Sequence, residues 1–115
     1  MNNFVFYSPT EFVFGKDTEI QTGTLAKKYN ARKAMIVYGG GSIIRSGLLQ
    51  RIEDSLQQAA VDYVKLGGVQ PNPTDPKVYE GIELARKEGV DFMLPVGGGS
   101  VIDTAKAIAA GGPYE

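Results

Sequence analysis

Two copies of the tetrapeptide Gly-Gly-Gly-Ser, each directly after an apolar run, constrain the fold of this chain more than any other feature. They span Gly39–Ser42 after Ala34–Tyr38 and Gly97–Ser100 after Phe92–Val96. Short apolar runs of this kind are typical of buried strands, and the residues after each tetrapeptide have helical periodicity. The sequence therefore predicts two strand–turn–helix units with glycine at the turn.

Such turns favour binding of a phosphate. Glycine lets the backbone approach a ligand closely, and the free amides at a helix start face an anion with the positive end of the helix dipole. In an open α/β sheet, ligands bind outside the carboxyl ends of the strands. Two turns on one edge indicate a long ligand such as a dinucleotide. The candidate cofactor-binding residues are Gly39, Gly40, Gly41, Ser42, Gly97, Gly98, Gly99 and Ser100.

Strands and helices alternate from residue 34 onward. The pattern predicts a helix over 47–60, a strand over 61–66, a loop over 67–74, a helix from Thr74 or Asp75 to Gly89, and a helix over 100–110. This alternation is typical of βαβ units in a parallel sheet. The predicted fold class is α/β, a Rossmann-like parallel sheet with flanking helices.

The N-terminal part has a different pattern. Apolar residues alternate over Phe4–Tyr7 and Phe12–Gly15, which predicts a short β-hairpin or two edge strands. These apolar edges favour a homodimer formed through the N-terminal strands. A Thr-x-x-Gln capping box at Thr18 predicts a helix to about Tyr29. The chain stops after a helix with no returning strand, so we expect an incomplete domain: 1–115 as a truncated N-terminal nucleotide-binding domain.

Composition excludes several classes of function. The net charge of −1 gives no basic surplus for nucleic acid or an anionic membrane, and no apolar stretch is long enough to span a bilayer. The chain has no Cys and no recognisable secretion signal, so we expect a cytoplasmic location. It also has no His, which leaves a poor ligand set for zinc or catalytic iron and no usual general acid–base group. We therefore expect neither a metal site nor a catalytic residue in this chain.

A wider pattern resembles a known family. Pro71-Asn72-Pro73-Thr74, followed by Gly97-Gly98-Gly99-Ser100-Val101-Ile102-Asp103-Thr104-Ala105-Lys106-Ala107, resembles the N-terminal half of the iron-containing (group III) alcohol dehydrogenases. Similarity is greatest to the branch of butanol dehydrogenases and NADP-dependent aldehyde reductases. The resemblance implies a Rossmann-like cofactor domain here, and a separate helical domain, absent from this chain, that holds a divalent metal (iron or zinc).

The resemblance also implies roles for single residues. It places the second Gly-Gly-Gly-Ser on the coenzyme pyrophosphate and Asn72 near its adenosine side, although Asn72 also suits a plain turn between two prolines. Asp103 either accepts a hydrogen bond from a coenzyme hydroxyl or stabilises the helix start. Lys106 is more simply a solvated helix lysine.

The first turn bears on coenzyme choice. Family members that use NAD resemble one another in having an acidic residue where this chain has Gly39. A carboxylate repels a 2′-phosphate, whereas glycine amides and the Ser42 hydroxyl can donate to one. Arg45 can add a positive charge, or simply face solvent. We therefore expect NADP(H) to be preferred over NAD(H).

The predicted function is the dinucleotide-binding part of an NADP(H)-dependent, metal-dependent alcohol dehydrogenase or aldehyde reductase, an oxidoreductase acting on primary alcohols such as butanol. The 115-residue chain alone is expected to be inactive. Two alternatives stay open: a non-catalytic nucleotide-binding module, and a fragment of a related glycerol or glycerol-phosphate dehydrogenase.

Overall fold

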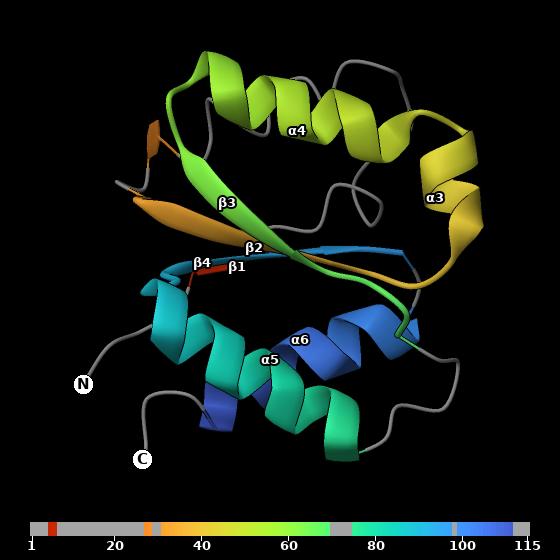
Figure 1. Cartoon of the computed structure of the whole chain (residues 1–115), viewed down its shortest axis with the longest axis vertical. Helices are drawn as coiled ribbons and strands as arrows, with labels where there is room; N and C mark the ends of the chain where they lie inside the picture. The colour runs from red at the N-terminus through yellow and green to blue at the C-terminus, as the bar shows by residue number, and fades with distance from the viewer. Residues whose placement is uncertain (1–4, 7–26, 29–30, 70–74, 98, 112–115) are drawn as a thin grey trace.

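The structure is a computed structural model that describes residues 5–6, 27–28, 31–69, 75–97 and 99–111. It contains a four-stranded sheet in the order β1-β4-β2-β3, in which every neighbouring pair is parallel (Figure 1). The strands are β1 (Val5–Phe6), β2 (Lys33–Tyr38), β3 (Asp62–Leu66) and β4 (Phe92–Val96). The parallel α/β fold class predicted from the alternating pattern is confirmed.

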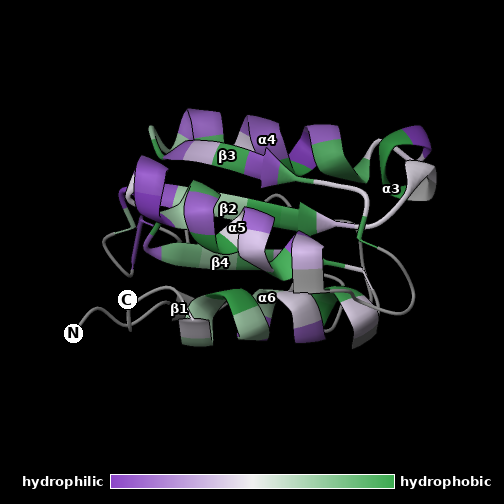
Figure 2. Ribbon diagram, turned by 60° about the horizontal axis from the view of Figure 1, so that its bottom comes forward, coloured by the Kyte–Doolittle hydropathy of each residue, from purple (hydrophilic) through white to green (hydrophobic). Residues whose placement is uncertain are grey.

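Helices cover both faces of this sheet. They are α3 (Gly41–Arg45), α4 (Leu48–Gln58), α5 (Asp75–Glu88) and α6 (Gly99–Gly111). In Figure 1, α3 and α4 lie on one side of the sheet, and α5 and α6 lie on the other. Figure 2 shows hydrophilic residues on the outer sides of α4 and α5 and apolar residues along β2 and β4.

The alternation of side chains along the central strands produces two cores. One face of β2 contributes Ala34 and Ile36, which pack with buried residues of α4. The other face contributes Met35 and Val37, which pack with Ala105 and Ile108 of α6. All five residues of β4 are buried. Burial on both faces explains why β2 and β4 have continuous apolar sequences.

Helix ends follow local signals in the sequence. Gly89 ends α5 with φ +68°, and the Val90 amide donates to the carbonyl of Ala85 at 2.9 Å. This left-handed glycine is the expected helix stop. At the start of α4, the Ser46 hydroxyl accepts a hydrogen bond from the Leu48 amide at 3.3 Å. The Ser46 side chain therefore supplies the cap that Gly47 lacks.

The amino ends of β2 and β4 are joined by one carboxylate. Asp91 accepts hydrogen bonds from the backbone amides of Arg32 and Lys33 at 3.1 and 3.2 Å. The Asp91 amide donates in return to the carbonyl of Lys33 at 3.0 Å. These bonds lie where the two strands begin and hold their relative register.

One part of the prediction needs correction, and another lies partly outside the described residues. A short helix, α3, follows β2 where we expected only a turn before a helix at residue 47, so Gly41 and Ser42 begin a helix. In the N-terminal region, Val5–Phe6 joins the sheet as an edge strand parallel to β4, which agrees with the predicted alternative of edge strands. The second half of the predicted hairpin lies outside the described residues, as does most of the helix predicted over 18–29, of which Lys27 and Lys28 are helical.

Candidate coenzyme-binding edge

The two glycine turns leave adjacent strands at the same edge of the sheet. In the register of β2 and β4, Tyr38 lies opposite Val96, and both strands end there. Gly39 and Gly97 are the next residues of the chain. The prediction that both turns lie on the carboxyl edge of the sheet is confirmed.

After these turns the chain departs to opposite faces. The segment after β2 forms α3 and α4 on one side, whereas the segment after β4 forms α6 on the other (Figure 1). Neighbouring parallel strands whose connections diverge in this way mark a topological switch point, where the two loops separate and leave a crevice for a ligand. The chain topology therefore selects this edge as the candidate site.

Val101, in the first turn of α6, lies between the two turns and limits the space around their backbones. A Cβ added to Gly97 would lie 3.0 Å from Val101 Cγ2, and Gly97 itself has φ +145°. A Cβ added to Gly39 would lie 3.1 Å from the carbonyl oxygen of Val69 and 3.9 Å from Val101 Cγ2. The positive φ of Gly97 thus favours glycine there, whereas a side chain at Gly39 would need the Val69 carbonyl oxygen to move by a few tenths of an ångström.

Gly40 differs from these two neighbours. A Cβ built on Gly40 meets no atom of the described residues within 4 Å. The fold therefore does not require glycine at this position. Close approach of a ligand to the Gly40 backbone would be a separate reason for glycine at this position.

Both turns continue directly into helices. Gly41 is the first residue of α3, and Gly99 is the first residue of α6, with Ser100 next. The first amides of a helix have no partner within it and carry partial positive charge. Near the start of α6, the buried Thr104 hydroxyl donates to the carbonyl of Ser100 at 2.9 Å. The edge therefore offers groups of backbone amides suited to an anion.

Charged side chains also lie at this edge. A Cβ built on Gly41 would lie 2.7 Å from Nη1 of Arg45, so the guanidinium lies over the first turn. Asp103 and Lys106 are exposed on α6. Within the described part of the chain, Asp103 makes no hydrogen bond with a helix amide, and its interpretation as a ligand contact or a helix-stabilising charge stays open. Asn72 and Gly98 lie outside the described residues.

Sequence reasoning missed one component of this edge. Residues 67–69 were expected only as a loop, but they lie along the first glycine turn. The Gly68 amide donates to the carbonyl of Gly39 at 2.9 Å, and the Val69 amide donates to the carbonyl of Tyr38 at 3.2 Å. The glycine pair directly after a predicted strand was the available signal.

The other candidate features lie away from this edge. Tyr63 has a pKa raised above 10.0 by burial and by its hydrogen bond to Glu53, which is 2.7 Å long. It pairs with Ala34 near the amino end of the sheet.

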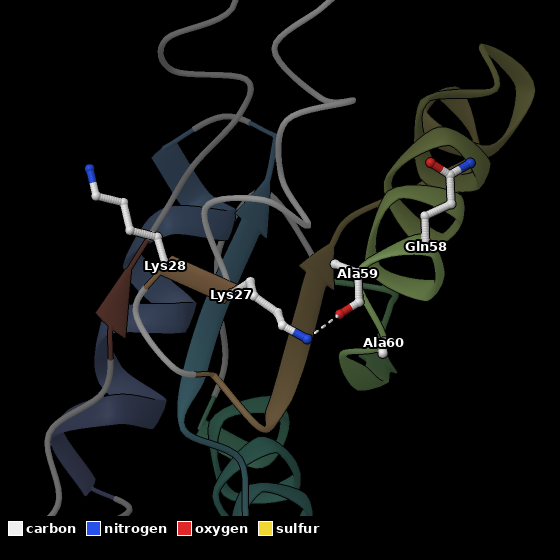
Figure 3. A pocket seen from close by; sticks show the side chains of 5 residues that line it. All are labelled: Lys27, Lys28, Gln58, Ala59 and Ala60. Atoms are coloured by element: carbon white, nitrogen blue, oxygen red, sulfur yellow. Dashed lines mark hydrogen bonds between the residues drawn. The ribbon is translucent and has the colours of Figure 1, made fainter.

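A hollow near the end of α4 also lies away from the glycine turns. It is lined by Lys27, Lys28, Gln58, Ala59 and Ala60, and Lys27 Nζ donates to the carbonyl of Ala59 at 3.2 Å (Figure 3).

The described residues do not provide a metal site. The chain has no His and no Cys. In the parts that the structure describes, no three carboxylates lie close enough together to hold a metal ion. Over the same residues, no helix has the length and apolar character needed to cross a membrane.

Comparison with known families agrees with this geometry. The family model "Iron-containing alcohol dehydrogenase" matches residues 9–114, which include both glycine turns. The chain belongs to the iron-containing alcohol dehydrogenase family. The resemblance stated from Pro71–Thr74 and from the second glycine turn is thereby confirmed.

Relatives within the family include butanol dehydrogenases and an aldehyde reductase. The chain is 45% identical over 115 residues to the probable NADH-dependent butanol dehydrogenase 2 of Bacillus subtilis, covering 100% of this chain and 29% of that relative. It is 38% identical over 114 residues to the NADPH-dependent aldehyde reductase YqhD of Escherichia coli, covering 99% and 28%. The chain thus spans less than a third of the length of these relatives.

A solved structure shows the same fold. The crystal structure of NADH-dependent butanol dehydrogenase A from Thermotoga maritima matches with a TM-score of 0.85 and 48% identity, covering 100% of this chain and 29% of that protein. The Rossmann-like assignment is confirmed by this match. The names of the relatives include both NADH and NADPH, so the family alone does not select between the two coenzymes.

Proposed function

We propose that this chain is the dinucleotide-binding part of an NADP(H)-dependent alcohol dehydrogenase or aldehyde reductase acting on primary alcohols such as butanol. The observation that carries the proposal is the pairing of Tyr38 with Val96, which brings two glycine turns together where the chain departs to opposite faces. The family membership and the names of the relatives support the same reaction class.

In this proposal each turn binds a different part of the coenzyme. The second glycine turn, Gly97–Ser100, binds the pyrophosphate because the positive end of the α6 helix dipole favours an anion there. Gly39–Ser42 lie beside the adenosine ribose, as does Asn72. When bound, NADP(H) supplies the hydride exchanged with the carbon of the alcohol or aldehyde. The divalent metal, iron or zinc, is proposed to be held by a helical domain outside residues 1–115.

The preference for NADP(H) rests on charge at the first turn. Gly39 and Gly40 place no carboxylate there, and the Arg45 guanidinium lies over Gly41. A 2′-phosphate therefore meets amides and one positive charge rather than an acid. We expect Arg45→Ala to weaken NADP⁺ binding about three- to tenfold with little effect on NAD⁺, because the contact is exposed and screened. Arg51→Ala, which removes an equal charge from α4, is the matched control.

The test is a parallel titration of the chain with NADP⁺ and NAD⁺, followed by NMR so that weak binding is measured. Tighter binding of NADP⁺, lost in Arg45→Ala but not in Arg51→Ala, supports the proposal. Equal affinity for both coenzymes would refute the stated preference, and no binding of either would refute the coenzyme role.

The isolated chain is expected to show no turnover of butanal with NADPH, because the proposed metal ligands lie elsewhere. Metal-dependent turnover by residues 1–115 alone would contradict the proposal that the metal ligands lie outside this chain. A cytoplasmic location and a homodimer formed through the N-terminal strands stay predictions. Analytical ultracentrifugation of the chain tests the second of them.

A further inference from the structure

The side chain of Lys77 reaches from α5 toward the carboxyl edge of the sheet. Its Nζ donates to the carbonyl of Gly67 at 3.0 Å and to Glu80 Oε1 at 3.1 Å. The Lys77 side chain is 24% exposed, whereas Glu80 is 58% exposed. Lys77 is therefore held against the backbone ten residues before it instead of extending into solvent.

The contacted segment, residues 67–69, lies directly on the first glycine turn. Besides the two hydrogen bonds to the carbonyls of Tyr38 and Gly39, the Val69 carbonyl oxygen occupies the space that a side chain at Gly39 would need. Val69 is also buried, at 6% exposure, in the same core cluster as Val101. A shift of this segment would therefore move the backbone of the turn.

Two glycines, Gly67 and Gly68, allow residues 67–69 to lie close to β2 and to α5. A Cβ built on Gly67 would lie 2.6 Å from ring atoms of Tyr38, so the segment approaches β2 closely only because Gly67 has no side chain. Gly68 is left-handed, with φ +78°, and a Cβ there would lie 3.7 Å from Lys77 Nζ. Glycine adopts this conformation without strain, so the chain can turn here close to α5. Lys77 is the charged side chain that contacts this segment from α5.

We propose that Lys77 is a positioning residue for the coenzyme: by holding residues 67–69 on Gly39, it fixes the backbone of the first glycine turn. This inference rests on the proposed coenzyme function. Lys77 touches neither turn itself and acts through the Gly67 carbonyl.

The experiment compares Lys77→Met with two further variants in the 115-residue chain, labelled with ¹⁵N. Lys77→Met keeps the aliphatic stem and removes the donor. Lys77→Arg keeps a charged donor of similar reach and is the conservative rescue. Glu80→Gln is the matched control, because it removes the charge of the second partner of Lys77 and leaves the Gly67 contact in place.

Two readouts are taken from each variant. Amide hydrogen exchange at Gly68 and Val69 reports whether their bonds to Gly39 and Tyr38 persist, with Ile36 in the core of β2 as the internal reference. Titration with NADP⁺ reports affinity. Loss of one hydrogen bond to the backbone predicts exchange about three- to tenfold faster at Gly68 and Val69, with a similar loss of affinity in Lys77→Met. Lys77→Arg and Glu80→Gln are expected to stay near the unsubstituted chain.

The outcomes separate this inference from the proposed function. Unchanged exchange at Gly68 and Val69 in Lys77→Met would overturn it, with or without coenzyme. Faster exchange with unchanged NADP⁺ affinity would also overturn it, because the segment would then not govern the site. If Lys77→Met unfolds, failure of Lys77→Arg to keep both readouts would overturn it. Failure of the unsubstituted chain to bind NADP⁺ is a different result, which refutes the proposed function itself.

Discussion

Substitution of Gly81 by alanine tests how closely α5 and α6 pack beneath the sheet. Gly81 is buried inside α5, and a Cβ there would overlap Ile108 Cδ1, lie 2.7 Å from Ile108 Cγ1 and lie 3.0 Å from Leu66 Cδ2. Both neighbours are buried, Ile108 at 0% and Leu66 at 2% exposure. The clash therefore cannot be relieved by a side chain swinging into solvent.

Two opposing terms set the size of the effect. Alanine in place of glycine stabilises a helix interior by about 1 kcal/mol. Overpacking a well-packed core costs about 1–3 kcal/mol. We therefore expect Gly81→Ala to lower the free energy of unfolding by up to about 2 kcal/mol, the difference between these terms. The helix term is measured separately by Ala107→Gly, an exposed position of α6, which should cost about 1 kcal/mol.

The assay is urea unfolding followed by circular dichroism, extended to a double-mutant cycle. Ile108→Val removes Cδ1 and should cost about 0.5–1.5 kcal/mol alone. Combined with Gly81→Ala, it removes the closest of the three contacts of the new methyl group, so the double variant should be more stable than the two single effects predict. If Gly81→Ala instead raises stability by about 1 kcal/mol, as an exposed helix glycine would, the argument from packing is wrong.

Three further predictions concern single positions. Gly40→Asp should leave urea unfolding unchanged, since a Cβ there meets no described atom within 4 Å. The same substitution should weaken NADP⁺ binding in an NMR titration, because the new carboxylate repels the 2′-phosphate. A loss of folding stability in Gly40→Asp would indicate instead that the fold requires glycine at this position. Ala60→Gly should raise the free energy of unfolding by up to about 1 kcal/mol, because Ala60 is exposed with φ 60°, and a lower unfolding midpoint would argue against strain there. The raised pKa of Tyr63 means that the folded state holds its proton longer than the unfolded chain, so stability should fall as pH rises above 10.0. Tyr63→Phe should reduce that alkaline loss in unfolding measured across pH, and an identical slope in the variant would assign the loss to other groups.

How much of the fold could be predicted depends on how local its causes are. The strand Phe92–Val96 was predicted with the observed bounds, because its burial on both faces leaves an uninterrupted apolar run between polar neighbours. The end of α5 at Gly89 could be predicted for the same reason. A left-handed backbone at a helix end favours glycine whatever the rest of the fold is.

The missed features depend on contacts distant in sequence. The short helix α3 begins inside a glycine triplet, which in sequence looks like a turn, and five residues are too few to show a periodicity. The placement of residues 67–69 on the first turn depends on hydrogen bonds from Gly68 and Val69 to Gly39 and Tyr38, which lie 29 and 31 positions earlier. The edge of the sheet was predictable, whereas the segment packed beside it was not.

The carboxylate of Asp91 has an effect at the opposite end of the sheet. It fastens the beginnings of two parallel strands, and those strands run side by side until Tyr38 and Val96 finish level. A slip of one residue would displace one glycine turn against the other by about 3.3 Å, a full hydrogen-bond length. The alignment of the two glycine turns is thus set at the opposite end of the sheet, by an aspartate that lies outside the proposed coenzyme site.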